Sequence, residues 1–154
     1  MEIKAFLEHQ EEDSQNVASV KELYNSVLPA IIFKVLTGES TDISSNLLVE
    51  NPTWNVCPGF PDGGIYCGMA EVFGKLYANL LKRYHYFNGE PEVFIDGGNV
   101  VTVLGHYIVV IKKGEPAIRV RFSHTWKIAP DGRIEGVWQV ADSAVLWEGL
   151  NNLD

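Results

Sequence analysis

Two side chains with proton-transfer chemistry lie in the last third of the chain, His124 and Asp142. Each belongs to an alternating run of residues, and a Pro-Asp-Gly turn at 130–132 joins the two runs. This pattern predicts a β-hairpin. An imidazole in such a wall donates a hydrogen bond to a ligand carbonyl or acts as a general acid or base. A carboxylate among indole rings suits proton abstraction beside a carbonyl, because desolvation makes it a stronger base.

Strand alternation places both groups on one mostly aromatic face, which is typical of a cavity wall. The residues predicted for that face are Phe122, His124, Trp126, Ile128, Ile134, Trp138, Val140 and Asp142. Each candidate also has a structural interpretation. His124 is alternatively a buried histidine whose nitrogens are satisfied by backbone or by a tyrosine. Asp142 is alternatively the cap of a following helix over residues 143–150.

Other aromatic side chains extend the candidate site. The Tyr24 phenol, on the first predicted helix, either donates to a ligand oxygen or packs in the core. The same two alternatives, pocket lining or core packing, apply to the remaining aromatic residues. As lining they favour a small, flat, hydrophobic or aromatic ligand. The predicted ligand-binding residues are Tyr24, Trp54, Tyr66, Phe73, Tyr77, Phe122, Trp126 and Trp138.

The composition restricts the classes of partner. The chain has 154 residues, 46% of them hydrophobic and 21% charged, with a net charge of −8 and only 12 Lys and Arg. So few cations argue against binding nucleic acid or anionic membranes. The most apolar stretch, 27–36, is too short to span a bilayer, and the acidic N-terminus differs from a signal peptide. Cys57 and Cys67 have neither metal nor redox spacing. We therefore expect a cytoplasmic protein with no metal site and no cofactor.

Helical signals come first along the chain. Residues 1–13 are predicted to be a flexible arm, followed by a single domain over 14–150. Ser14 is expected to cap a helix with one buried stripe of apolar residues, in which Pro29 either causes a kink or begins a second helix. Residues 38–42 end that helix, and 44–48 are predicted to form a short helical turn. A second helix is expected over 70–83.

Strand signals dominate the rest of the chain. A short strand is expected at 53–56, before a loop rich in Pro and Gly at 58–64. The other strands are expected near 84–87, 91–96, 100–111, 117–128 and 134–142. Helices followed by consecutive strands indicate an α+β fold, with the helices packed on one face of a bent, mainly antiparallel sheet.

Several segments together resemble the nuclear transport factor 2-like superfamily, and within it the SnoaL-like group of polyketide-cyclase and ketosteroid-isomerase relatives. The order and spacing of these segments carry the resemblance, which covers roughly residues 14–147. They are Trp54-Asn-Val56, Gly64-Ile-Tyr66-Cys-Gly68-Met-Ala-Glu71, Glu92 to Gly105, Phe122-Ser-His124-Thr-Trp126, Asp131-Gly-Arg-Ile134 and Ala141-Asp142-Ser143. The resemblance implies an open cone, a bent sheet wrapped on helices, with a ligand cavity in its mouth.

The resemblance also implies roles for single positions. His124 occupies the place where the isomerases hold a protonated acid that binds an oxyanion. Where they have a base on the short strand, this chain has Asn55, an amide. The cyclases often show Trp-Asp-x-x-Asp where residues 138–142 read Trp-Gln-Val-Ala-Asp, so the first acid is missing. The epoxide hydrolases use an Asp-Arg-Asp set. This chain offers counterparts only of the arginine and of one aspartate, namely Arg119 and Asp142.

Two functions from different classes follow. The first is an isomerase, cyclase or hydrolase that acts on a small hydrophobic carbonyl compound, with His124 and Asp142 transferring protons. The second is a non-catalytic binding, dimerisation or scaffold domain. The resemblance further implies a homodimer, which we expect to form through an outer sheet face carrying Val101, Val103, Val120 and Val137.

Overall fold

The first helical segment begins where the sequence predicts. The structure is a computed structural model that describes residues 12–39 and 46–152. Helix α2 spans Gln15–Glu22, and the Ser14 hydroxyl accepts the Val17 N–H at 3.2 Å, which confirms Ser14 as its N-cap. Its buried side chains include Val17 and Val20, which hold it against the sheet. Of the predicted arm over 1–13, the described residues include only the last two, so the arm and the single domain stay predictions.

Pro29 begins a new helix without breaking the direction of the chain. A π-helical segment, η1, spans Leu23–Val27 and leads directly into α3, Leu28–Thr37, with Pro29 in its first turn. Because proline has no N–H and its ring crowds the preceding turn, a widened turn at this place accommodates it. The segment ends at Gly38, whose φ of 68° is the left-handed conformation that favours glycine.

The second predicted helix is confirmed as one continuous helical run. It consists of α4, Met69–Glu71, the π-helical segment η2, Val72–Tyr77, and α5, Ala78–Arg83. Its apolar stripe buries Val72, Phe73, Leu76 and Leu80. A last helix, α6, Ser143–Asn151, follows the final strand. None of the helices in 12–39 and 46–152 is long and apolar enough to cross a membrane.

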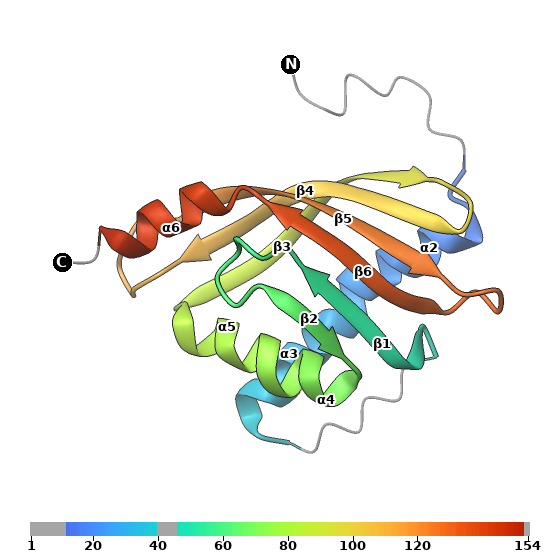
Figure 1. Cartoon of the computed structure of the whole chain (residues 1–154), viewed down its shortest axis with the longest axis horizontal. Helices are drawn as coiled ribbons and strands as arrows, with labels where there is room; N and C mark the ends of the chain where they lie inside the picture. Colours follow the sequence, from blue (N-terminus) through green and yellow to red (C-terminus); the bar gives the residue numbers. More distant parts are fainter. Residues whose placement is uncertain (1–11, 40–45, 153–154) are drawn as a thin grey trace.

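Six strands form one bent sheet, on one face of which α2 and α3 lie (Figure 1). The strands run in the order β2-β1-β6-β5-β4-β3, and all pairs are antiparallel except β1 with β6. This arrangement confirms the α+β class with helices on a bent, mainly antiparallel sheet. The bounds are β1 Leu48–Val56, β2 Gly64–Cys67, β3 Tyr86–Asp96, β4 Val100–Val110, β5 Ile118–Ile128 and β6 Ile134–Ala141.

Some strand boundaries differ from the prediction. The expected turn at Asn88-Gly89 is absent, because both residues pair with β4 and join the two predicted strands into β3, with an irregularity only between Pro91 and Val93. The short strand expected at 53–56 begins earlier, at Leu48, so the helical turn predicted over 44–48 is wrong at Leu48, whereas residues 46 and 47 form a turn. Strand β2 was not predicted, and it lies between the loop expected at 58–64 and the helix expected from residue 70.

The hairpin face was predicted wrongly beyond its turn. Ile134 lies opposite Ile128, but Gly136 lies opposite Lys127, so Glu135 is an extra residue in β6. Such a bulge shifts the alternation by one residue. Val137 and Gln139 therefore face inward, whereas Trp138 is 63% exposed and Val140 is 42% exposed on the outer face.

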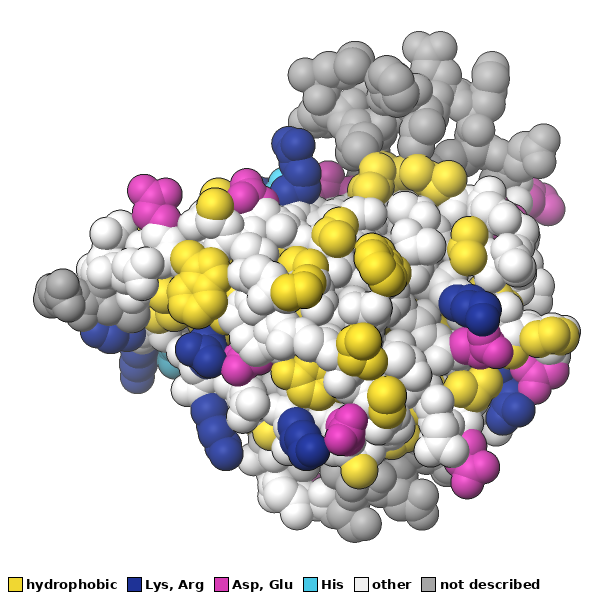
Figure 2. Space-filling view, viewed as in Figure 1, with side chains coloured by type: hydrophobic (Ala, Val, Ile, Leu, Met, Phe, Trp, Pro, Cys, Tyr) yellow, Lys and Arg dark blue, Asp and Glu magenta, His cyan; other side chains and the backbone are white. Residues whose placement is uncertain are grey.

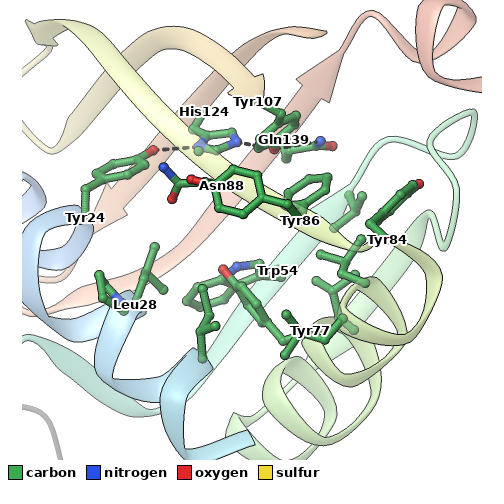
Figure 3. Close-up of a pocket in the computed structure, with 18 of the residues that line it drawn as sticks. Tyr24, Leu28, Trp54, Tyr77, Tyr84, Tyr86, Asn88, Tyr107, His124 and Gln139 are labelled. Carbon is green, nitrogen blue, oxygen red and sulfur yellow. Dashed lines mark hydrogen bonds between the residues drawn. The ribbon is translucent and has the colours of Figure 1, made fainter. Parts of the chain in front are cut away.

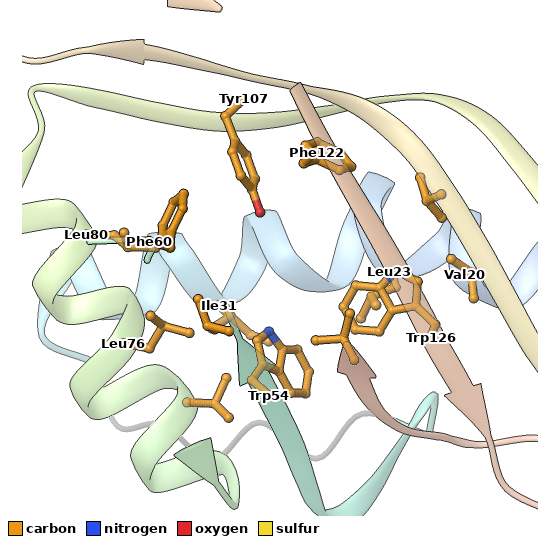
Figure 4. Packing of buried hydrophobic residues seen from close by; sticks show 14 of the residues in the cluster. Val20, Leu23, Ile31, Trp54, Phe60, Leu76, Leu80, Tyr107, Phe122 and Trp126 are labelled. Atoms are coloured by element: carbon orange, nitrogen blue, oxygen red, sulfur yellow. The ribbon is translucent and has the colours of Figure 1, made fainter. Parts of the chain in front are cut away.

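The core lies between the inner sheet face and the helices. Figure 4 shows Val20, Leu23 and Ile31 on the helices and Trp54, Phe122 and Trp126 on the strands. The four valines expected on the outer face are buried in this core as well, which corrects the predicted dimer surface. Their positions alternate with the exposed ones, and the inward set is Val101, Val103, Val120 and Val137.

Candidate functional site

A pocket of about 430 Å³ opens beside His124, with walls from the helices and the inner sheet face (Figure 3). This volume lies in the range of sites that hold small molecules. Among the described residues that line it, none is Asp, Glu, Lys or Arg. The lining residues are Tyr24, Leu28, Pro29, Ile32, Phe33, Leu36, Trp54, Val56, Leu76, Tyr77, Leu80, Leu81, Tyr84, His85, Tyr86, Phe87, Asn88, Gly89, Tyr107, His124, Trp126, Val137 and Gln139.

His124 is held between two phenols at the inner end of this pocket (Figure 3). Its Nδ1 lies 2.5 Å from the Tyr24 hydroxyl, and its Nε2 lies 2.5 Å from the Tyr107 hydroxyl. The ring of Phe122 stacks on the imidazole at a centroid distance of 3.9 Å. Both ring nitrogens are therefore satisfied, and the ring is fixed in orientation.

Two further side chains orient the phenols. Trp126 donates its indole N–H to the Tyr24 hydroxyl at 2.9 Å, and Gln139 donates its side-chain amide to the Tyr107 hydroxyl at 3.1 Å. The side-chain Oε1 of Gln139 accepts the backbone N–H of Cys57 at 3.1 Å, and the backbone oxygen of Gln139 accepts the same N–H at 3.0 Å. Since that N–H can only donate, it determines which end of the Gln139 amide faces the phenol.

Burial keeps this cluster uncharged. It lowers the pKa of His124 from 6.5 to about 3, so the imidazole is neutral at physiological pH. Burial also raises the pKa of Tyr24 and of Tyr107 well above the ordinary phenol value. The pKa of Tyr77 rises to about 12 for the same reason, although a hydrogen bond with Trp54 opposes the rise. These four pocket groups are therefore neutral hydrogen-bonding groups.

The fold has close counterparts among solved structures, whereas no protein-family model and no curated protein matches the chain. An NTF2-like protein of unknown function from Burkholderia pseudomallei K96243 is 22% identical, with a TM-score of 0.69 over 88% of this chain and 97% of that one. A putative SnoaL-like polyketide cyclase from Jannaschia sp. CCS1 is 14% identical, with a TM-score of 0.66 over 95% and 100%.

A third structure was obtained by co-crystallisation. TerC, co-crystallised with polyporic acid, is 20% identical, with a TM-score of 0.71 over 90% of this chain and 100% of that one. The chain has the nuclear transport factor 2-like fold. The resemblance found in the sequence is thereby confirmed at the level of the fold.

Half of the predicted site residues lie at the pocket of this nuclear transport factor 2-like fold. The structure brings together Tyr24, Trp54, Tyr77, His124 and Trp126. Their positions follow from correct helix periodicity and from correct strand alternation up to the hairpin turn. The interpretation of His124 as a buried histidine satisfied by tyrosine describes its contacts correctly. Those same contacts hold its ring in the pocket wall.

The other predicted residues lie elsewhere. Phe73 and Phe122 are buried core residues, and Tyr66 donates its hydroxyl to the Asp62 carbonyl at 2.6 Å. Trp138 is on the outer face because of the bulge at Glu135. Asp142 is exposed just beyond β6, at the N-cap position of α6, and its side chain makes no capping hydrogen bond. The prediction that His124, Trp126, Trp138 and Asp142 line one cavity is therefore wrong for the last two.

Sequence reasoning missed two essential neighbours of His124. Tyr107 was missed because Val101 and Val103, with which it alternates along β4, were assigned to the outer face, whereas the structure places this set inward. Gln139 was not detectable from alternation, because the bulge reverses its face. Asn88 was also missed, since the Asn-Gly pair at 88–89 was interpreted as a turn, whereas its side chain lines the pocket.

Proposed function

We propose that the pocket binds a small, flat, uncharged hydrophobic compound that carries a carbonyl oxygen. Its aromatic and aliphatic walls favour such a ligand, and the described lining offers no charged partner for an ion. The fold likeness to TerC supports a small organic ligand, since that protein was co-crystallised with polyporic acid. The observation that carries the proposal is the arrangement of protons around His124.

The hydrogen bonds around His124 leave one donor over. A neutral imidazole has one N–H and one acceptor nitrogen, so it donates to one phenol and accepts from the other. Each phenol oxygen already accepts one bond, from Trp126 or from Gln139. The phenol that accepts the imidazole N–H therefore keeps its own O–H unused.

That spare O–H belongs to Tyr24 or to Tyr107, according to the tautomer of His124. Both phenols line the pocket, so the His124 cluster offers one hydrogen-bond donor to a ligand oxygen, besides the buried hydroxyl of Tyr84 in the same lining, which has no partner among the described residues. A donor buried in an apolar pocket selects for ligands that carry an acceptor, because it is otherwise left unpaired.

Binding is favoured over proton abstraction by the same geometry. Both nitrogens of His124 are occupied and its pKa is lowered to about 3, so it is a poor base toward a ligand. Asp142, the other predicted base, is exposed and is not among the lining residues. A reaction at this site would pass its proton through the phenol O–H, which suits polarising a carbonyl more than removing a proton beside it.

A matched pair of ligands tests the proposal. Fluorenone and fluorene share a flat ring system, but only fluorenone has a carbonyl. We expect fluorenone to bind about 5- to 30-fold more tightly, since one hydrogen bond from a buried donor contributes about 1–2 kcal/mol. Quenching of tryptophan fluorescence reports binding, because Trp54 and Trp126 line the pocket. The carbonyl stretching band of bound fluorenone should also move to lower wavenumber.

Variants identify the donor. The double substitution Tyr24→Phe with Tyr107→Phe should remove the preference for fluorenone, whereas Tyr77→Phe, a buried phenol of the same pocket outside the His124 cluster, should keep it. Equal affinity of the unmodified protein for the two ligands, with an unshifted carbonyl band, would contradict the proposal. Turnover of a ketone with a pH-dependent rate would favour the enzymatic alternative.

We also propose a homodimer formed through the outer sheet face. On that face, one residue from each of the six strands pairs with the next in a row across the sheet. The exposed apolar residues of this row are Ile65, Trp138 and Ile95, and the uncharged polar residues between them are Asn55, Thr125 and Thr102. Figure 2 shows hydrophobic and uncharged side chains in the middle of one face of the molecule, with charged side chains mostly around them. Such a self-complementary surface suits a two-fold contact, with a second copy as its occupant.

Replacing Trp138 tests this surface. We expect a dimer mass by light scattering at micromolar concentration, and Trp138→Ser should raise the dimer dissociation constant at least 10-fold, because a large exposed aromatic side chain at the centre of an interface dominates its energy. Leu36→Ser, equally exposed but on α3, is the control and should leave the mass unchanged. A monomer mass for the unmodified chain would refute the dimer.

A further inference from the structure

Helix α3 is far more apolar than its burial requires. It reads Leu-Pro-Ala-Ile-Ile-Phe-Lys-Val-Leu-Thr, yet Ile31 is its only fully buried side chain. Phe33 remains 60% exposed and Leu36 64% exposed. Isolated exposed apolar residues are ordinary, but a stripe of them on one short helix calls for a physical explanation.

The exposed stripe is continuous with the pocket. Phe33 and Leu36 line the same cavity as His124, as do Leu28, Pro29 and Ile32 on the same helix. Across from them, Leu81 of α5 and the half-exposed Tyr86 at the start of β3 complete the lining. The apolar surface therefore runs from the buried end at His124 outward to solvent.

We propose that the ligand of this pocket is elongated, with its flat carbonyl-bearing head at His124 and an apolar tail that leaves along Phe33 and Leu36. This proposal rests on the proposed function, since it assigns the orientation of the same ligand. The hydrogen-bonding donors lie at the inner end and the exposed stripe contributes only apolar side chains. The donors at the inner end stabilise a polar head, because it accepts a hydrogen bond there in place of water. The exposed stripe stabilises a hydrocarbon tail, because contact removes apolar surface from water on both sides.

The chain's own exposed side chains supply the specificity. A compound that ends within the cavity leaves Phe33 and Leu36 in water, whereas a tail covers them and is itself removed from water. The affinity then rises with tail length only while the tail contacts the stripe. An experiment measures this dependence of affinity on tail length.

Fluorenones with straight alkyl chains of 0, 4, 8 or 12 carbons, attached at the ring edge away from the carbonyl, test the proposal below their micelle concentrations. For the unmodified chain we expect affinity to rise about twofold per methylene for the shorter tails, within the limit for full burial of a methylene. The double variant Phe33→Ser with Leu36→Ser should lose this dependence, so that its affinities for the four compounds agree within about threefold. Ile65→Ser, equally exposed on β2 and outside the pocket lining, should retain it.

Different results separate the failures. If unsubstituted fluorenone does not bind, the proposed function fails. If it binds but tail length has no effect, only the elongated ligand is refuted. A sedimentation mass that falls in the Phe33→Ser, Leu36→Ser variant would overturn it in favour of a second copy on the stripe. Flotation of the unmodified chain, but not the variant, with phosphatidylcholine vesicles would overturn it in favour of a membrane surface.

Discussion

Lowering the pH from 7.5 to 5 is expected to decrease the free energy of unfolding by about 2 kcal/mol through His124 alone. Burial lowers its pKa from 6.5 in the unfolded chain to about 3 in the folded chain. Between these values the unfolded chain binds a proton that the folded chain does not. The stabilisation is therefore complete above pH 6.5 and is lost as the pH falls toward 3, by about 1.4 kcal/mol per pH unit.

Urea unfolding at several pH values between 7.5 and 5 measures this effect. The window lies above the ordinary range of carboxyl titration, so histidines dominate it. His124→Gln should be less stable at pH 7.5 but should lose much of the pH dependence. His85→Gln is the matched control, because His85 is exposed, and it should leave the dependence intact. An unaltered dependence in His124→Gln would show that its imidazole does not titrate as the burial requires.

The neutrality of His124 also determines what the pocket offers a ligand. A protonated imidazole donates from both nitrogens, which would free the O–H groups of both Tyr24 and Tyr107. The neutral ring frees only one. The burial that makes the fold sensitive to acid is thus the property that limits the His124 cluster to one free donor, so the stability measurement bears on the proposed ligand as well.

Local signals predicted the parts of the fold that depend on few neighbours. Ser14 caps α2 through its own hydroxyl, and Gly38 ends α3 because it adopts a positive φ. The Pro-Asp-Gly turn joins β5 and β6 because such residues suit a tight reversal. Each signal acts within a few residues, so the sequence alone contains the information.

Long-range pairing overrode other local signals. Asn88 and Gly89 favour a turn, but β4 is long enough to pair with the whole of β3, and the gain in ladder hydrogen bonds keeps the chain extended. The cluster around His124 is similarly non-local, since Tyr24 and Tyr107 come from a distant helix and a neighbouring strand. Periodicity placed Tyr24 on a helix that packs on the sheet, but the face of β4 that carries Tyr107 was assigned outward, and no local pattern shows which residues meet.

The face of β6 was unpredictable for a different reason. Strand alternation assigns residues to the two sheet faces by counting along the strand, so a single unpaired residue reverses the face assigned to every later residue. Glu135 is that residue, and nothing in its side chain distinguishes it from a regular strand position. It is the reason that Gln139, and not Trp138, contacts Tyr107.

Replacing Gly136, next to this bulge, by alanine is expected to destabilise the fold by about 3 kcal/mol. A Cβ atom at this position would lie 2.3 Å from the Thr53 carbonyl oxygen of the paired strand β1, so the backbone of one strand has to move. Gly74→Ala is the control: that glycine is exposed in a helical segment with no atom within 4 Å of the added Cβ, and its change should be neutral or stabilising by up to about 1 kcal/mol. Urea unfolding compares the two.

The effect of Gly136→Ala should reach the pocket as well as the stability. Gln139 is held by Cys57, the residue that directly follows β1, so a shift between β1 and β6 pulls its amide away from Tyr107. With that bond weakened, the phenol is less firmly oriented, and the preference for fluorenone over fluorene should fall even where the variant is folded. A variant that loses stability but keeps the full preference for fluorenone would contradict this expectation. It would show that β6 and β1 move together, so that Gln139 stays in place whatever residue occupies position 136.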